Sequence, residues 1–186
     1  TAYLVNSSVT VTNLASITGA ADSNWNSVSI TSANSNTSLS AAGLADGTYK
    51  LYTVDAAGNL SAASTNSVTI DSTAPTVSSI AYGTNDGNLA AGESLTLTVT
   101  FSEAVNVTGT PTIALNSGGT ASYSSGTGTN TLTFSYTPAA GQSTADLATA
   151  TNSAFSGTIT DAAGNPVVAS GFNNVNPTGT LAVDTA

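Results

Sequence analysis

Apolar and polar residues alternate over several short stretches of this chain. Residues 95–101 read Leu-Thr-Leu-Thr-Val-Thr-Phe, and residues 132–136 read Leu-Thr-Phe-Ser-Tyr. A period of two is the pattern of a β-strand that has one face in a core and a polar, threonine-rich face in water. We find no window of useful length with helical spacing. The pattern therefore predicts an all-β protein.

Seven stretches of the second part of the chain are predicted as strands, and Gly-, Asn- and Ser-rich turns separate them. They are residues 77–82, 94–101, 112–115, 120–123, 131–136, 157–160 and 180–184. Many short strands divided by such turns are typical of a Greek-key β-sandwich. Residues 74–186 are therefore predicted to form a complete sandwich of the immunoglobulin-like kind.

The first part of the chain is less regular. Its predicted strands are residues 1–5, 9–11, 49–53 and 66–70. Between residues 13 and 47 we expect Trp25, Val28 and Ile30 to be the core contacts. Tyr49, Leu51 and Thr53 share a face that we expect to be buried, and Lys50 points to the exposed face. A unit of residues 1–73 is short, since such sandwiches usually need about 100 residues. We therefore expect a short or partial domain.

One five-residue sequence, Asp-Ala-Ala-Gly-Asn, occurs twice, at residues 55–59 and 161–165. Each copy follows a strand-like run and precedes another run, and these later runs end at Asp71 and Asp184. The repeat predicts a tandem array of two related units. A hairpin loop is the simplest interpretation, because Gly adopts turn conformations and Asp and Asn bond their own backbone. Carboxylate and amide oxygens also suit calcium.

The charge balance and the missing residue types exclude several functions. The chain has one basic residue, Lys50, against ten acidic ones, for a net charge of −9. Nucleic acid and anionic membranes are therefore not expected partners. No His or Cys supplies a general base, a thiol nucleophile or a zinc-thiolate site. No apolar run is long enough to insert into a membrane. We predict that the protein is not an enzyme.

Three segments carry a resemblance to a known family. Residues 47–59, 70–76 and 99–105 are similar to bacterial immunoglobulin-like repeats, which form arrays in giant secreted adhesins of the RTX and Bap types. The resemblance covers nearly all of the second unit and the first from about Gly47. It implies two tandem immunoglobulin-like β-sandwiches in an extracellular protein, on the bacterial surface or secreted. Neighbouring domains of the same longer chain are the implied partners, often with calcium at the junctions.

The acidic residues suggest where calcium would bind. If the seven strands of the second unit alternate in direction, the loops that carry Glu103 and Asp161 lie beside Asp71. Asn165, in the same turn as Asp161, is a further candidate ligand. No basic residue in this unit neutralises these acids, so their mutual repulsion favours a bound cation. Solvated acids without an ion are the alternative.

The opposite end of the second unit carries a second candidate site. There Asp86 and Asp146 are predicted to approach Asp184. Asp46 is a further candidate for the first site, and Asp55 for a site with a preceding domain.

Three functions follow from this sequence. The first is a spacer segment of a bacterial cell-surface adhesin, stiffened by calcium at domain junctions. The second is a self-associating extracellular fibre or surface-layer subunit, in which a strand from another copy completes the short first unit. The third is a glycan- or peptide-binding module, with Tyr3, Trp25 and Tyr82 as candidate contacts.

Overall fold

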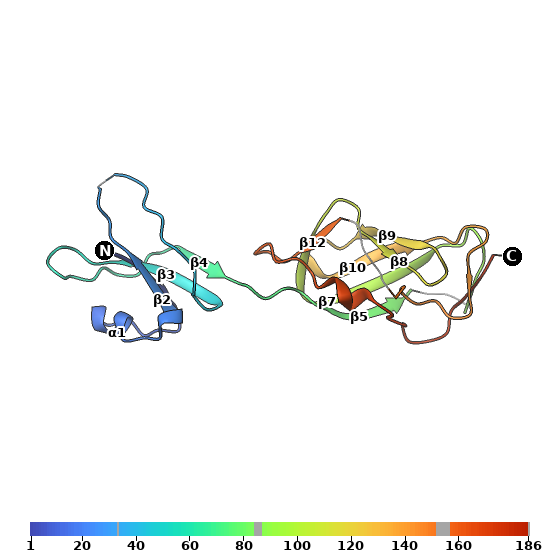
Figure 1. Cartoon of the computed structure of the whole chain (residues 1–186), viewed down its shortest axis with the longest axis horizontal. Helices are drawn as coiled ribbons and strands as arrows, with labels where there is room; N and C mark the ends of the chain where they lie inside the picture. The colour runs from blue at the N-terminus through green and yellow to red at the C-terminus, as the bar shows by residue number, and fades with distance from the viewer. Residues whose placement is uncertain (33, 84–86, 152–156, 186) are drawn as a thin grey trace. The chain divides into compact units, whose positions relative to one another are not determined.

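The computed structural model describes residues 1–32, 34–83, 87–151 and 157–185 of the chain. The chain forms two compact units, Thr1–Thr73 and Ala74–Ala186 (Figure 1). Strands make up 41% of the structure and helices 7%, which confirms the prediction of an all-β protein.

The first unit contains one antiparallel sheet with the strand order β2-β1-β3-β4. Its strands are β1 (Ala2–Asn6), β2 (Trp25–Val28), β3 (Gly47–Thr53) and β4 (Ser67–Ile70). Its helices are α1 (Leu14–Thr18) and the 3-10 helix η1 (Asp22–Asn24). All strand pairs in this sheet are antiparallel. The described part of this unit therefore has a single sheet.

The prediction of a strand at residues 9–11 was wrong. These residues lead into α1, whose first turn is closed by a capping box. The Asn13 side chain accepts the N–H of Ser16 at 2.9 Å, and the Ser16 hydroxyl oxygen accepts the N–H of Asn13 at 3.2 Å. These bonds satisfy N–H groups that a helix otherwise leaves without partners. The helix then buries Ile17 completely.

The apolar core of the first unit is small. Its buried apolar side chains among the described residues are Ala2, Val5, Ile17 and Tyr49. The Tyr49 hydroxyl donates to the carbonyl oxygens of Ser23 and Ala45, which ties β3 to both of these positions.

Several expected core positions of this unit are in fact open. Trp25 and Val28 are half-buried, whereas Ile30 lies beyond the end of β2 and is 49% exposed. The face that starts with Tyr49 does not stay buried, since Leu51 is 40% exposed and Thr53 is exposed. Lys50 is half-buried rather than exposed. Alternation along β3 indicates two faces, but no second sheet in the described residues covers either of them.

The second unit contains two sheets. The larger has the order β12-β7-β10-β9-β8, with β5 also paired to β7, and the smaller has the order β11-β13-β6. The strands are β5 (Val77–Tyr82), β6 (Asn88–Leu89), β7 (Leu95–Thr108), β8 (Thr112–Ala114), β9 (Thr120–Ser125), β10 (Thr129–Tyr136), β11 (Ser143–Thr144), β12 (Thr158–Thr160) and β13 (Ala182–Asp184). A 3-10 helix, η2 (Ala169–Phe172), precedes β13.

Each of the seven stretches predicted for this unit contains a strand. The two-residue strands β6 and β11 were not predicted, because two residues are too few to show alternation. Strand β7 was predicted to end at Phe101 but continues to Thr108, where it pairs with β12. Glu103 therefore lies within a strand and not in a loop.

The core of this unit is centred on β7 and β10. Leu97, Val99 and Phe101 alternate on the buried face of β7, and Leu132 and Phe134 do so on β10. Strand β10 pairs with β7 in register from Leu132 opposite Val99 to Phe134 opposite Leu97. The alternation read from the sequence therefore identifies the buried face of these two strands correctly.

The predicted alternation of strand directions fails at β12. Strand β10 occupies one edge of β7, so β5 and β12 share the other edge. Both are antiparallel to β7, β5 against residues 97–101 and β12 against residues 106–108. They therefore run in the same direction, and Glu103 lies between the start of β5 and the end of β12.

Candidate functional site: an acidic cluster at the start of the second unit

The two Asp-Ala-Ala-Gly-Asn sequences form hairpins with matching hydrogen bonds. In each, the Asp N–H donates to the Asn carbonyl oxygen at 3.1 Å. Oδ1 of Asp55 accepts the N–H of Asn59 at 2.8 Å, and Oδ2 accepts the Asn59 amide at 2.9 Å. The corresponding distances from Asn165 to Asp161 are 2.8 Å and 2.7 Å. This local geometry is the hairpin loop that the sequence predicts.

The two aspartates differ in burial. Asp55 is exposed, whereas Asp161 is only 3% exposed. Burial acts to raise the pKa of Asp161, but hydrogen bonds from the Asn165 amide and from the N–H groups of Asn165, Gly164 and Ala163 outweigh it. The pKa of Asp161 is therefore lowered from 3.8, and the carboxylate is ionised at neutral pH.

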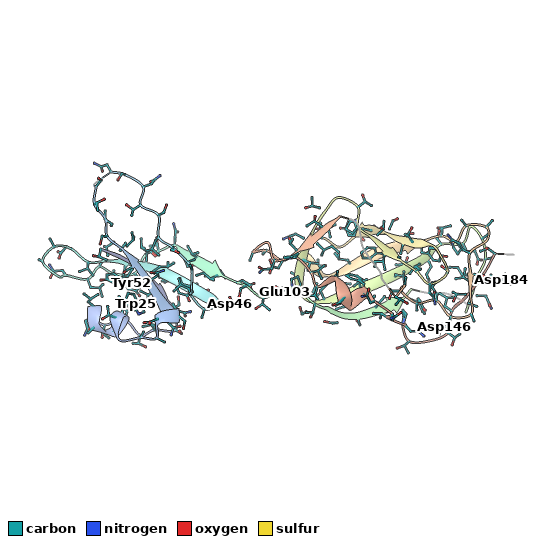
Figure 2. All side chains as sticks on the ribbon, in the orientation of Figure 1. Trp25, Asp46, Tyr52, Glu103, Asp146 and Asp184 are labelled. Carbon is teal, nitrogen blue, oxygen red and sulfur yellow. The ribbon has the colours of Figure 1, made fainter. Side chains whose placement is uncertain are left out.

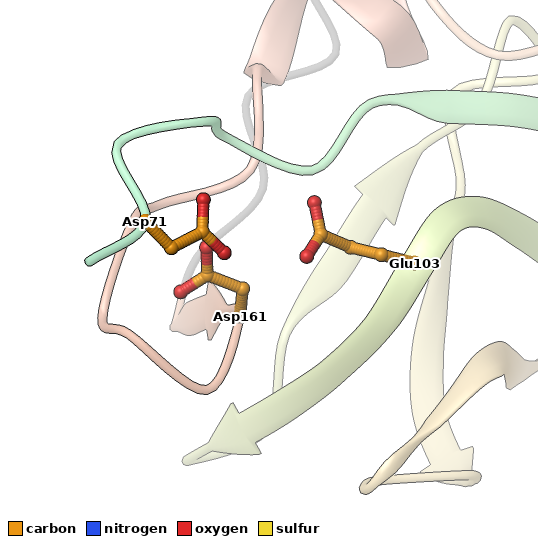
Figure 3. A group of neighbouring side chains, drawn as sticks. All are labelled: Asp71, Glu103 and Asp161. Carbon is orange, nitrogen blue, oxygen red and sulfur yellow. The ribbon is translucent and has the colours of Figure 1, made fainter. Parts of the chain in front are cut away.

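Asp161 is one of three carboxylates that lie close together (Figure 3). One oxygen from each of Asp71, Glu103 and Asp161 can be chosen so that all three lie within 4.8 Å of one another. Asp71 comes from the connector, Glu103 from the middle of β7, and Asp161 directly follows β12. Asp71 and Glu103 are half-buried.

The predicted meeting of these three acids is found, but for a different reason from the one the sequence suggested. Strand β7 is long enough to pair with two strands on one edge. Strand β5 begins opposite Phe101, and β12 ends opposite Asn106. The start of β5 and the end of β12 therefore both lie next to Glu103. The placement depends on this shared edge and not on an alternation of strand directions.

The chemistry of the cluster suits a hard divalent cation. Calcium takes carboxylate oxygens as its main ligands, and three acids can supply several of the six to eight that it needs. Asn165 holds Asp161 in place through its amide. Acidic groups also gather without an ion, so the cluster defines a candidate site only.

The cluster of Asp86, Asp146 and Asp184 predicted at the other end of the second unit stays a prediction. Figure 2 shows Glu103 at one end of this unit and Asp146 and Asp184 at the other. Asp86 lies outside the described residues. Within the described part of the chain, only Asp71, Glu103 and Asp161 form a group of three possible ligands.

The Asp146 carboxylate forms hydrogen bonds within the second unit. Its carboxylate accepts the Asn176 amide at 2.8 Å and the N–H of Leu181 at 3.1 Å, and these bonds lower its pKa. Asp184 ends β13, opposite Ser143. Asp146 thus stabilises the segment that leads into β13.

Asp46 contacts the connector and is not part of the acidic cluster. Its carboxylate accepts the Ser72 hydroxyl at 2.8 Å, the Thr73 hydroxyl at 2.9 Å and the Ser72 N–H at 2.9 Å. The hydroxyl bonds from Ser72 and Thr73 are the main reasons why its pKa is lowered. Sequence spacing could not have identified this role, because 26 residues separate Asp46 from Ser72.

The aromatic residues expected to contact a ligand have different environments. The Tyr82 hydroxyl donates to the carbonyl oxygen of Leu147. Burial, with a smaller effect from the Asp146 charge, raises the pKa of Tyr82 to about 12. The Tyr82 hydroxyl is therefore hydrogen-bonded within the second unit. Tyr3 and Trp25 pack with their ring centroids 5.9 Å apart.

Comparison of the chain with protein-family models, with curated proteins and with solved structures finds no match. None of the helices in the described ranges is long and apolar enough to span a membrane. Any function is therefore inferred from the geometry above.

Proposed function

We propose that the chain is a structural spacer segment of a bacterial cell-surface adhesin, built from immunoglobulin-like β-sandwich units of a longer extracellular chain. The observation that carries this proposal is the repeated hairpin, which has matching hydrogen bonds in both units. Repeated units with separate cores and short connections let a chain extend without new functional residues. The resemblance to bacterial immunoglobulin-like repeats supports the same proposal.

Calcium is part of this proposal. Asp71, Glu103 and Asp161 would bind the ion, and Asn165 would orient Asp161. Without a cation, three carboxylates this close repel one another. A bound calcium ion would remove this repulsion and tie the connector to β7 and β12. The connector would then have less conformational freedom, which suits a spacer.

The test is calcium titration calorimetry together with small-angle scattering, in calcium and in excess chelator. We expect calcium binding that Glu103→Gln weakens about tenfold or more, because affinity depends on the number of charged ligands. Chelator should broaden the distribution of sizes seen by scattering. Asp22→Asn is the matched control, since it removes a charge away from the cluster. A chelator-insensitive protein that takes up no calcium would overturn the calcium part of the proposal.

Self-association is a second candidate function, and the sheet of the first unit favours it. Strands β2 and β4 are the edges of that sheet, and Val68 on β4 is 54% exposed. An exposed edge strand can pair with a strand from another copy. Growth of the particles with concentration in the same scattering series would support a fibre subunit, and a constant monomer mass would exclude it.

A further inference from the structure

The hydrogen bonds of β3 show which of its residues face β4. In an antiparallel pair, alternate residues direct their N–H and C=O groups to the neighbouring strand, and the others direct them away. The Leu51 N–H donates to the Ser64 hydroxyl oxygen at 2.9 Å, and the Leu51 carbonyl oxygen accepts the Ser64 N–H at 2.8 Å. Ser64 precedes β4, so Leu51 faces the β4 side of β3. By alternation, Tyr49 faces β4 as well.

Strand β4 therefore has backbone groups that point away from the sheet. Tyr49 lies opposite Val68, so the backbone groups of Val68 face β3. Those of Ser67 and Thr69 point the other way. Within the described part of the chain, no hydrogen bond to these outward groups of Ser67 and Thr69 is found. Both residues are exposed, so another strand can reach them.

The edge of β4 has none of the features that usually keep edge strands apart. Such strands are protected by charged side chains, by proline or by bulges. The strand reads Ser-Val-Thr-Ile, with no proline, and residues 60–70 carry no charged side chain. Its pairing with β3 runs without a register shift. The edge is therefore open to pairing.

The other edge of the sheet, β2, is less open. The Ser7 N–H donates to the carbonyl oxygen of Thr48 at 2.8 Å, so Thr48 faces β1. Alternation through β3 and β1 then makes Trp25 and Ser27 the outward residues of β2. The Ser27 N–H already donates to the Asn26 side-chain oxygen at 2.8 Å. A fibre would need both edges, whereas one open edge is enough for a closed pair of copies.

We propose that β4 pairs antiparallel with β4 of a second copy, so that the chain forms a closed two-fold dimer. This inference rests on the self-association candidate above and names its partner and its end point. A two-fold interface uses the same surface of both copies, so no β4 edge is left to add a third.

The outward groups also determine the register of this pairing. Residues opposite each other on neighbouring strands lie on the same face of a sheet. With Ser67 opposite the partner's Thr69, all the outward N–H and C=O groups of both β4 strands are paired. Val68 then lies opposite the partner's Val68, in a pair without mutual hydrogen bonds, where the side chains are closest.

This register also covers apolar surface. Val68 is 54% exposed, and together with Leu4 and Leu51 it lines a groove of about 470 Å³. None of the residues that line this groove is charged. The partner's Val68 would lie at the rim of the groove. Copies of a chain with a net charge of −9 repel one another, so an uncharged surface is where two of them can approach.

The first experiment measures the mass of the intact chain in solution by sedimentation, in chelator and over a range of concentrations. We expect the mass to rise to twice that of the chain and to stay there. Thr69→Pro removes the outward N–H and leaves the bonds between β3 and β4 in place. It should weaken the dimer by about tenfold or more, because each dimer loses two backbone hydrogen bonds.

Thr69→Val is the matched control, since it changes the same side chain but keeps the N–H. We expect it to dimerise as the wild type does. Circular dichroism and the fluorescence of Trp25 show whether Thr69→Pro is folded.

A cysteine pair tests the register without a proline. The chain has no Cys, so a single introduced thiol can only form a disulfide with a second copy. Val68→Cys should form this disulfide readily under mild oxidation, because each thiol lies opposite the other across the two-fold axis. Thr69→Cys, which lies opposite the partner's Ser67, should do so much more slowly.

The outcomes separate this proposal from the broader candidate. A monomer at every concentration would overturn both the dimer and self-association. A mass that grows beyond the dimer would overturn the closed dimer and support the fibre. Folded Thr69→Pro that dimerises like the wild type, or equal cross-linking of Val68→Cys and Thr69→Cys, would overturn the pairing through β4. Because chelator is present throughout, all of these results are independent of the calcium proposal.

Discussion

At the scale of single residues, Asp55 and Asp161 show how burial changes the consequence of one local structure. Both carboxylates accept the backbone N–H and the amide of the Asn four residues later. Asp55 is in solvent, where water can replace these donors. Asp161 is almost fully buried, so each lost donor leaves the charge with less compensation.

Asn165→Ala is therefore predicted to make the second unit less stable to acid. The folded pKa of Asp161 lies below its ordinary value of 3.8. Its ionised form thus stabilises the fold above that pH, and this contribution is lost as the pH falls through the folded pKa. Without the Asn165 amide the folded pKa rises, so the contribution becomes smaller and its loss is complete at a higher pH. Acid titration followed by NMR signals of second-unit residues measures this effect.

Asn59→Ala is the matched control for that prediction. It removes the same donor from the exposed Asp55 of the first unit, where we expect a smaller change in the acid stability of that unit. An acid midpoint for Asn165→Ala equal to that of the wild type would contradict the role given to Asn165.

At the scale of elements, the turn between β9 and β10 depends on two glycines with different surroundings. The Gly128 N–H donates to the carbonyl oxygen of Val105 at 2.8 Å, and the Thr127 hydroxyl accepts the N–H of Val107 at 2.9 Å. The turn thus also contacts β7. Gly126 and Gly128 both have positive φ, +112° and +82°.

Gly126→Ala is predicted to cost more stability than Gly128→Ala. A Cβ at Gly126 would lie 2.2 Å from the carbonyl oxygen of Thr131, whereas one at Gly128 would meet nothing within 4 Å. Gly128→Ala should cost only the conformational penalty, about 1–2 kcal/mol. Gly126→Ala adds a forced backbone shift in β10, so its cost should be clearly larger. Urea unfolding of the second unit measures both, and equal losses would show that β10 adjusts without cost.

At the scale of the whole molecule, the two units have very different cores. Four apolar side chains are buried among the described residues of the first unit, and nineteen in the second. Burial of apolar area is the dominant favourable contribution to folding. The first unit is therefore the less stable of the two.

We accordingly predict two unfolding transitions. Fluorescence of Trp25, which reports only on the first unit, should change at a lower urea concentration than most of the circular dichroism signal. Leu132→Ala removes a fully buried side chain of β10 and should lower the stability of the second unit by about 2–5 kcal/mol. This substitution should not change the urea concentration at which the Trp25 fluorescence changes. Coincident transitions, or a Trp25 transition that moves with Leu132→Ala, would show that the units unfold together.

Much of this structure follows from local sequence. Alternation identified the strands and their buried faces at Leu97 and Phe134, because side chains on a strand point to opposite faces in turn. The two Asp-Ala-Ala-Gly-Asn hairpins were predictable because the bonds from each Asn to its Asp lie within five residues. The helix α1 was also readable in principle from its cap at Asn13 and Ser16, although no helical spacing revealed it.

Other features depend on contacts between distant residues. Alternation in β3 could not show that Leu51 would stay exposed, since burial also needs a layer to cover the face. Nor could it show that β12 pairs with the same edge of β7 as β5, which brings Asp161 and Glu103 together. The sequence by itself determined the all-β class, most of the strands and the repeated hairpins, through local periodicity and local hydrogen bonds. Only the tertiary structure decided the acidic cluster and the open first sheet, because pairing of edges and covering of faces are set by residues far apart in the chain.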